Sequence, residues 1–542
     1  GEGEGGGART LIDAMSLYGA PVQCAVKRQS SGAPKKSPSE RQILRGDRPV
    51  IATHRIATVI VRALALAGVT LALAAPAQAQ NTATEALQKA RVYERLAEGM
   101  AVEKKGEAPG FVLDPAWPQP LPNNWVIGDV GGIAVDKHNQ IWVYHRPRSV
   151  GSQDSGMQGA AAKDAKGNAI SVLGHPRPNG QINGCCDSAP SILVFNPAGK
   201  LLKAWGGPAD KDFLQTKCRE ADGCFWPARE HGIYVDHNDF VYIAGNGQAR
   251  AFYGQYPWAP KFGDDSHILK FKADGTFVYQ IGFAGAKGPN SNDTNGGVNG
   301  TPEPYWPADM VVDPKTNLMY IADGYGNRRV LIVDAATGKY VGHFGAYGQN
   351  PVVGENATGQ AYGAAWYDDY KAGNMKPKFF RSPLHCARLA NDGLLYACDR
   401  GNNRVQIFKA AEAGKPCENP NGEVGKCGYV GEVHVAPQSI GGTSGTVNFS
   451  TDAKQSCMYV ADLVNDVIYV MNRQNLTELT RVGGGGRQAG QFHWPHVVAN
   501  DTNGNMYVGE VDGAARVQRF LRYGATGCSG TGSAEVGKYL VR

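Results

Sequence analysis

The sequence has 542 residues with 71 glycines and 31 prolines, 19% of its residues are charged, and its mean hydropathy is -0.34. These values describe a turn-rich globular protein and exclude a polytopic membrane protein. Length alone decides little about domain number, because all-β propellers and barrels often form long single domains.

An apolar segment near the N-terminus predicts a signal peptide over residues 51–79. Arg55 and Arg62 precede the apolar run 63–75, which is followed by an Ala-Gln-Ala triplet. This run is too short to span a bilayer and ends at a typical cleavage site, which disfavours a membrane anchor. We therefore expect cleavage before Gln80 and a secreted or periplasmic protein.

The positive charge of the chain is concentrated in the segment that precedes the expected cleavage site. Residues 1–79 carry ten of the 55 basic and five of the 49 acidic residues, which leaves 45 and 44 in the remainder. Residues 1–50 are expected either to be disordered or to result from a translation start that was assigned too far upstream. The nearly neutral remainder indicates neither a nucleic-acid partner nor an anionic membrane surface, so the expected partner is a small-molecule or peptide substrate. No oligomeric state is indicated.

Ten of the 11 cysteines, all but Cys24, follow the expected cleavage site, and an exported protein can form disulfides. A zinc-thiolate site is disfavoured because no paired Cys-x-x-Cys motifs occur. Other connectivities remain open, but the spacing favours three local pairs: Cys218 with Cys224, Cys386 with Cys398, and Cys417 with Cys427.

From residue 125 to 542 the sequence repeats a block made of a strand, an Asp- or Asn-containing turn and an aromatic-rich strand, six times in all. Such units bury their faces only against neighbours, which favours a propeller over a pair of β-sandwiches. We predict an all-β, six-bladed β-propeller at 125–542. A linker at 80–124 with a short helix at 84–100 precedes it. Either 110–113 or 538–541 is expected to close the ring.

Histidines begin the inner strand in alternate units of the predicted propeller. They stand in the second, fourth and sixth units, at His231, His385 and His496. Small or apolar residues take this place in two other units: Gly131 in the first and Ala308 in the third. The register of the fifth unit stays open, with candidates from Gly445 to Val447 that include no polar metal ligand.

Alternate blades of a six-fold ring are a third of a turn apart, so these three side chains are expected to converge on the axis. Three neutral imidazoles suit Zn²⁺ or another divalent metal and leave positions open for water or substrate. The alternative is that each histidine merely begins a strand, which the alternation disfavours. The remaining histidines of the mature chain are expected in turns or at the surface: His138, His145, His175, His237, His267, His343, His434 and His493.

A second set of polar residues follows the second strand in three units: Arg146, Tyr325 and Arg400. The end of strand two lies beside the start of strand one in an antiparallel blade, so these side chains are expected on the face of the histidines. A phenol near a divalent cation and guanidinium groups is a candidate general base. Four other arginines recur with the repeat and are interpreted as structural: Arg328, Arg329, Arg404 and Arg516.

The segments 323–330, Asp-Gly-Tyr-Gly-Asn-Arg-Arg-Val, and 399–405, Asp-Arg-Gly-Asn-Asn-Arg-Val, resemble NHL repeats. Over residues 125 to 525 the chain is similar to the peptidyl-α-hydroxyglycine α-amidating lyase family. The resemblance rests on His231-Gly232, Pro383-Leu384-His385, Pro495-His496, Asp323-Gly324-Tyr325 and Ala397-Cys398-Asp399-Arg400, with Arg146 as the early arginine and Arg148 as a near alternative.

The resemblance implies a zinc ion held by the three propeller histidines. It also implies that Tyr325, with Arg146 and Arg400, acts on an α-hydroxyglycine substrate to release an amide and glyoxylate. The chain departs from the family at Val497, where the family places an aspartate for a structural calcium, and at Trp494, which replaces a methionine. Calcium is therefore not expected at this position. Long inserts at 149–190, 284–304 and 345–380 are expected to reshape the mouth of the site.

Two other classes of function are compatible with the same sequence. A non-catalytic exported NHL propeller would present its loops to a protein or glycan, with a purely structural metal. A different metal-dependent hydrolase, such as a lactonase, would use the same open site, although such propellers rely on carboxylate-rich calcium sites. The residues favour the metal-dependent carbon–nitrogen lyase.

Overall fold

The computed structural model describes residues 106–150, 162–163, 169–170, 187–207, 218–247, 263–285, 288–351, 377–437, 439 and 442–531. All of them belong to the compact unit Ala83–Arg542. The predicted signal peptide at 51–79, the segment 1–50, the helix at 84–100 and the candidate strand at 538–541 lie outside the described residues.

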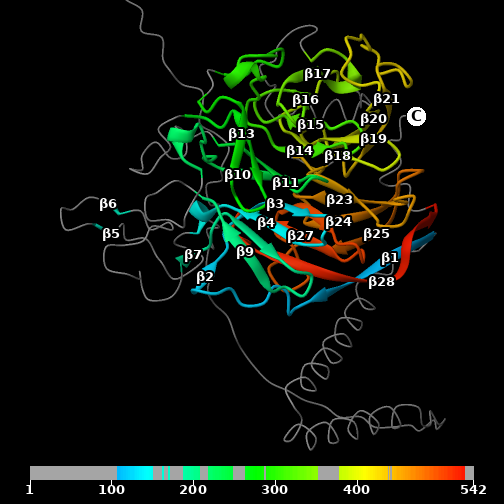
Figure 1. The fold of residues 1–542 in the computed structure, drawn as a ribbon. Helices are drawn as coiled ribbons and strands as arrows, with labels where there is room; N and C mark the ends of the chain where they lie inside the picture. The colour runs from blue at the N-terminus through cyan, green and yellow to red at the C-terminus, as the bar shows by residue number, and fades with distance from the viewer. Residues whose placement is uncertain are drawn as a thin grey trace, which may run out of the picture. The chain divides into compact units, whose positions relative to one another are not determined.

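The described chain forms six four-stranded antiparallel sheets, which confirms the all-β six-bladed propeller (Figure 1). Blade 1 consists of β3 (Val130–Val135), β4 (Ile141–His145), β8 (Ile192–Phe195) and β9 (Leu201–Trp205). Blade 2 consists of β10 (Glu230–Val235), β11 (Phe240–Gly245), β12 (His267–Lys272) and β13 (Phe277–Gly282). Blade 3 consists of β14 (Asp309–Val312), β15 (Leu318–Asp323), β16 (Arg329–Asp334) and β17 (Tyr340–Phe344).

Blade 4 consists of β18 (Leu384–Leu389), β19 (Leu394–Asp399), β20 (Arg404–Lys409) and β21 (Tyr429–His434). Blade 5 consists of β22 (Thr446–Phe449), β23 (Cys457–Asp462), β24 (Val467–Asn472) and β25 (Thr477–Gly483). Blade 6 consists of β26 (Pro495–Asn500), β27 (Met506–Glu510), β28 (Val517–Gly530) and, from the other end of the chain, β1 (Gly106–Asp114).

Short elements lie in the connections between the blade strands. β2 (Trp125–Val126) pairs in parallel with β7 (Asp187–Ser188), and β5 (Ala162–Lys163) pairs with β6 (Ala169–Ile170). The described helices are all short 3-10 turns: η1 (Pro147–Ser149), η2 (Glu220–Asp222), η3 (Val298–Gly300), η4 (Ala346–Gly348) and η5 (Arg400–Asn402).

Hydrophobic side chains pack between neighbouring blades rather than within one central core. Six clusters of buried residues each join two adjacent blades, and one of them joins blade 6 to blade 1. The inner strands contact one another in sequence from β3 through β10, β14, β18 and β22 to β26, which returns to β3. Each blade therefore depends on both neighbours for burial of its two faces.

The ring closes through pairing of the first and last described strands. β1 pairs antiparallel with β28 over Gly106–Asp114, so the candidate segment at 110–113 lies in this outer strand (Figure 1, blue beside red). The propeller therefore begins before residue 125, inside the segment that the sequence pattern placed in the linker. This pairing gives blade 6 its fourth strand and joins the first described strand to the last.

Four disulfides occur among the described residues. Cys218–Cys224, Cys386–Cys398 and Cys417–Cys427 confirm the three predicted local pairs. The fourth, Cys457–Cys528, joins β23 of blade 5 to β28 of blade 6 across a separation of 71 residues. Disulfides of this number are typical of an oxidising compartment. No helix within the described ranges has the length and apolar character needed to cross a membrane.

Arginines at the start of the third strand bind acidic residues at the end of the second strand. The Nε atoms of Arg329, Arg404 and Arg516 lie 2.8, 2.7 and 2.6 Å from carboxylate oxygens of Asp323, Asp399 and Glu510. These pairs confirm that the three arginines are structural features of the repeat. In blade 4, Arg404 also contacts Glu432 at 3.1 Å, with both side chains buried.

The Cys457–Cys528 disulfide between blades 5 and 6 is expected to stabilise the propeller more than a local one, because it removes more conformational entropy from the unfolded chain. Replacing both Cys457 and Cys528 by Ala should lower the free energy of unfolding by about 4 kcal/mol. Replacing Cys417 and Cys427, which are separated by 10 residues, in the same way should lower the free energy of unfolding by about 3 kcal/mol. Urea denaturation measures both free energies, and a larger loss from the local pair would contradict the dependence of the stabilisation on loop length.

Acid should weaken the Arg404–Glu432 pair. Burial alone would raise the pKa of Glu432, but the charge of Arg404 and hydrogen bonds from His434 and Gln406 outweigh it and lower the pKa to about 2. The pair therefore stabilises the fold above the unfolded-state pKa of about 4.3, and this contribution of about 3 kcal/mol is lost as the pH falls toward 2. Unfolding measured between pH 5 and pH 2 should show a flatter dependence in Glu432→Gln; an unchanged slope would contradict the assignment.

Candidate metal centre

Each of the three histidines stands at a β-bulge at the start of an inner strand. The pairing of β18 with β19 shifts by one residue between Leu384 and Cys386, which leaves His385 as the extra residue. The pairing of β26 with β27 shifts in the same way around His496, and that of β10 with β11 shifts between Glu230 and Ile233, around His231. A bulge re-aims one side chain out of the alternation of its strand, which here turns each imidazole toward the axis.

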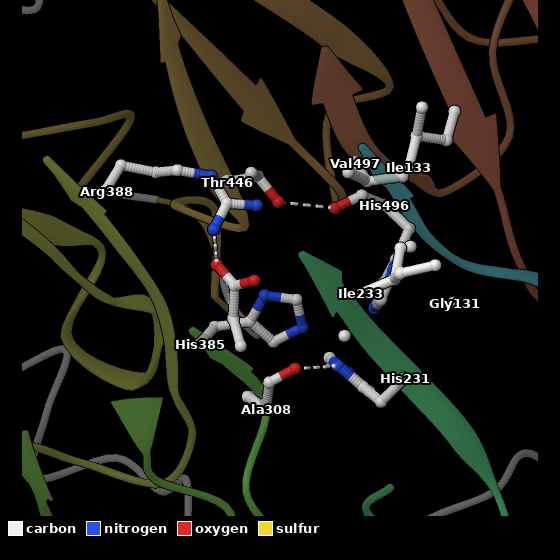
Figure 2. A pocket seen from close by; sticks show the side chains of 13 residues that line it. Gly131, Ile133, His231, Ile233, Ala308, His385, Arg388, Thr446, His496 and Val497 are labelled. Carbon is white, nitrogen blue, oxygen red and sulfur yellow. Dashed lines mark hydrogen bonds and ion pairs between the residues drawn. The ribbon is translucent and has the colours of Figure 1, made fainter. Parts of the chain in front are cut away.

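The structure brings the three imidazoles together. His231, His385 and His496 are all buried, and one nitrogen of each lies within 4.8 Å of the other two. Their ring centroids are 4.7 to 4.9 Å apart. Figure 2 shows the side chains converging from separate strands. The alternation of blades two, four and six therefore corresponds to a real cluster.

Two of the histidines are oriented by the main chain of the following blade. Nδ1 of His231 donates to the carbonyl oxygen of Ala308 at 2.7 Å, and Nδ1 of His385 donates to that of Gly445 at 2.7 Å. A carbonyl only accepts, so the proton is on Nδ1 and the lone pair is on Nε2 in the neutral ring. Such an outer hydrogen bond fixes both the tautomer and the ring orientation of a metal-binding histidine.

Glycine is required where neighbouring inner strands approach most closely. A Cβ atom at Gly131 would lie 2.6 Å from the carbonyl oxygen of Glu230, and one at Gly232 would lie 2.3 Å from that of Ala308. Gly232 thus lets His231 reach the Ala308 carbonyl. Gly131 occupies the axial position of blade 1, where a side chain of any size would collide with blade 2. Close packing therefore contributes to the restriction of histidines to alternate blades.

The imidazoles are suited to bind a cation rather than a proton. Burial lowers the pKa of His231, His385 and His496 well below the usual range, and nearby positive charges, including Arg146 and Arg400, add to this. Nε2 of His385 and Nδ1 of His496 are buried without a hydrogen-bond partner among the described residues. Neutral imidazole is the form that binds Zn²⁺ and similar ions, so this donor set could hold a divalent metal.

Tyr325 lies directly against the histidine cluster. Its hydroxyl group is 3.1 Å from Nε2 of His231, and its ring is 5.1 Å from that of His231 and 5.7 Å from that of His385. The loop after β15 is positioned by the Tyr325 N–H, which donates to the carbonyl oxygen of Trp306 at 3.3 Å. The phenol therefore stands at the edge of the candidate metal site.

The two arginines are held near the same cluster by main-chain carbonyls. Nε of Arg146 donates to Glu230 at 2.8 Å, and a terminal nitrogen of Arg146 lies 3.6 Å from Asp129. Nε of Arg400 donates to Gly442 at 3.4 Å. Both side chains are buried, and their charges contribute to the lowered pKa of His496. The side chain of the near alternative, Arg148, lies outside the described part of the chain.

Three polar residues line the axial cavity with the histidines: Asp309, Arg388 and Thr446. The sequence pattern did not indicate Asp309 or Arg388, whereas Thr446 lies in the range from Gly445 to Val447 that it left open for blade 5. Asp309 of blade 3 forms an ion pair with Arg388 of blade 4, and Oγ1 of Thr446 donates to the carbonyl oxygen of His496 at 2.8 Å (Figure 2). Within the range that the sequence left open for blade 5, Gly445 is the counterpart of Ala308, because both directly precede the inner strand and accept a hydrogen bond from a histidine Nδ1, and Thr446 corresponds to Asp309. In the sequence, the only feature that relates Asp309 to the site is that it directly follows Ala308. Nothing in the sequence pattern relates Asp309 to Arg388.

The expectation for three other histidines was wrong. His145, His267 and His434 are buried, not in exposed turns. His145 accepts a hydrogen bond from the Gly128 N–H at 3.1 Å and donates to the Pro190 carbonyl oxygen at 2.8 Å. Burial lowers the pKa of His145 to about 4. A buried imidazole whose two nitrogens bond the main chain has a structural role, and a lone histidine in a strand gives no sign of it.

Comparison with known proteins gives a distant relationship. No family model matches the chain. Peptidyl-glycine alpha-amidating monooxygenase B of Xenopus laevis is 24% identical over 210 residues, which cover 38% of this chain and 19% of that protein. Peptidyl-glycine alpha-amidating monooxygenase A of the same organism is 23% identical over 204 residues, which cover 38% and 18%. The chain is distantly similar to the amidating monooxygenases. It spans about a fifth of the length of these relatives.

Two solved structures were also matched. The WD40 beta propeller domain of Doa1 matches at 9% identity and a TM-score of 0.35, over 77% of this chain and 98% of that one. A streptogramin B lyase structure matches at 11% identity and a TM-score of 0.35, with the same coverage.

The histidine cluster is expected to bind one divalent ion per chain. Zinc added to metal-free protein should raise the melting temperature, because an ion that binds only the native state adds about 2.7 kcal/mol at a free concentration of 100 Kd. His385→Ala should abolish this shift and the bound metal measured by elemental analysis. His138→Ala, at an exposed turn, is the matched control. Equal metal content in both variants would disprove the site.

Proposed function

We propose that this protein is an exported, metal-dependent carbon–nitrogen lyase of the amidating type, which cleaves an α-hydroxyglycine unit into an amide and glyoxylate. The carrying observation is the contact between Tyr325 and the buried histidine cluster, with its phenol oxygen 3.1 Å from Nε2 of His231. The distant similarity to amidating enzymes supports the same class of reaction.

His231, His385 and His496 would hold the metal. A divalent ion with open positions acts as a Lewis acid toward a substrate oxygen. Tyr325 contacts His231 at one side of the cluster, and the substrate would approach the metal from that side. Zinc fits the donor set best, because neutral imidazole nitrogen is a preferred zinc ligand.

Tyr325 would take the proton of the substrate hydroxyl group. The C–N bond would then break, its electron pair would stay on the amide nitrogen, and Tyr325 would pass the proton it took to that nitrogen, so that the hydroxyl-bearing carbon becomes the aldehyde of glyoxylate. A general base must lie within hydrogen-bond reach of the proton that it removes. A substrate hydroxyl held at the histidine cluster would satisfy this condition, because Tyr325 contacts that cluster directly.

Arg146 and Arg400 would bind the substrate carboxylate and the charge that develops during cleavage. Both guanidinium groups are buried and act on the histidines electrostatically. Charge-assisted hydrogen bonds in a site shielded from water are stronger than those at a surface, and they discriminate in favour of an anionic substrate. The positive environment of the cluster therefore agrees with an acid as the substrate.

Export of the protein is part of this proposal. The four disulfides fit an oxidising compartment, and the sequence predicts a signal peptide over 51–79. The substrate would then be an extracellular or periplasmic compound with a free carboxylate.

Tyr325→Phe tests the reaction. Loss of the phenol oxygen should lower kcat for glyoxylate release from an N-acyl-α-hydroxyglycine by about 100-fold or more, because proton transfer in the transition state contributes this much. Bound zinc should stay at one ion per chain. Tyr523→Phe, an exposed tyrosine on β28, is the control. Absence of glyoxylate from zinc-loaded protein, or a wild-type rate in Tyr325→Phe, would overturn the proposal.

A further inference from the structure

An indole ring covers the guanidinium group of Arg400. The Arg400 Cζ atom lies 5.6 Å from the ring centroid of Trp494, within the range of a cation–π contact. Trp494 stands two residues before His496 and directly before Pro495, at the entrance of blade 6. Arg400 comes from blade 4, so the pair spans the entrance of blade 5.

The backbone of Trp494 is fixed in an uncommon conformation. Its φ angle is 54°, in the left-handed region that bulky residues rarely adopt, above all before a proline. The Trp494 N–H donates to Oδ1 of Asp466 at 2.8 Å, and its carbonyl oxygen accepts from the Val511 N–H at 3.2 Å. Trp306, which directly precedes Pro307 at the equivalent place in blade 3, has the same φ angle of 54°, so this backbone conformation is a feature of the repeat that fixes where the Trp494 indole stands.

Blade 5 leaves room for this pair because its entrance is built from small residues. Gly442 has a φ angle of 91°, and a Cβ atom there would lie 2.9 Å from Cγ of Arg400. The Gly442 carbonyl oxygen in turn accepts the hydrogen bond from Nε of Arg400. A larger residue at this position would displace the guanidinium group from beneath the indole.

A guanidinium group in a cation–π contact keeps those N–H groups that do not face the ring. The N–H groups of Arg400 that point along the edge can still bind a carboxylate in the plane of the guanidinium group. Trp494 is only half-buried, so part of the indole stays accessible beside that carboxylate. A planar apolar group attached near the carboxylate would therefore meet the indole.

We propose that Trp494 is a specificity-determining residue of this site, and that the preferred substrates are carboxylates with an aromatic acyl group next to the glycine-derived unit. This inference rests on the proposed function for the placement of the carboxylate on Arg400. Aromatic pairs add favourable energy beyond the burial of apolar area. Aliphatic acyl groups of the same length would lack that part of the interaction.

The test compares two unreactive ligands that differ in one group, N-benzoylglycine and N-acetylglycine. Calorimetric titration of zinc-loaded protein should give binding of the benzoyl ligand tighter by on the order of ten-fold. Trp494→Ala should reduce this ratio to about two-fold or less, whereas Trp494→Phe should retain part of it. The control is Trp205→Phe. Trp205 lies on β9, the outermost strand of blade 1, so its replacement should leave the ratio unchanged. Trp494→Leu replaces the alanine variant if that variant does not fold.

Turnover of the two matching α-hydroxyglycines separates this inference from the proposed function. Glyoxylate release with no benzoyl preference, or with a preference that survives in Trp494→Ala and Trp494→Leu, overturns the role of Trp494 and leaves the lyase function standing. A benzoyl preference that depends on Trp494 without any glyoxylate release supports the role of Trp494 and overturns the lyase. Failure of both ligands to bind overturns the inference.

Discussion

The hydrogen bond from a buried imidazole to the main chain of the next blade is the interaction on which the site depends. His231 and His385 each donate from Nδ1 to a carbonyl oxygen of the following inner strand, which directs Nε2 toward the axis. The same bond couples the site to the ring. Each acceptor, Ala308 or Gly445, keeps its place only because the blade that carries it packs on both neighbours. Orientation of the ligands is thus a property of the closed propeller rather than of a loop.

Close approach of the inner strands constrains the centre of the molecule. It requires glycine where two strands meet, as at Gly131 and Gly232, because a Cβ atom there would collide with the next strand. Histidines occupy the alternate positions. The β-bulges then supply the extra residue that turns each histidine inward. Three ligands on three separate blades give a rigid site, because movement of any one would require movement of a whole sheet.

Electrostatics gives this rigid centre neutral ligands in positive surroundings. Burial keeps the imidazoles neutral, and the buried guanidinium groups of Arg146 and Arg400 leave the surroundings positive. In the proposed function, an anionic substrate would supply the negative charge that a divalent cation needs in such surroundings. The stacked Trp494 fits the same scheme, because it covers the guanidinium face of Arg400 and leaves the edge for the ligand. Metal, carboxylate and acyl group would thus be recognised by neighbouring parts of one surface.

The sequence by itself determined the strands, the blade number, the three local disulfides and the alternation of His231, His385 and His496, because period-two patterning and short separations are local features. Only the tertiary structure decided how the ring closes, since Gly106–Asp114 pairs with residues more than 400 positions away. It also revealed the bulges, the Cys457–Cys528 bond and the Trp494–Arg400 stack. These features depend on register and on distant contacts, and residue type alone does not encode which distant partner a residue meets.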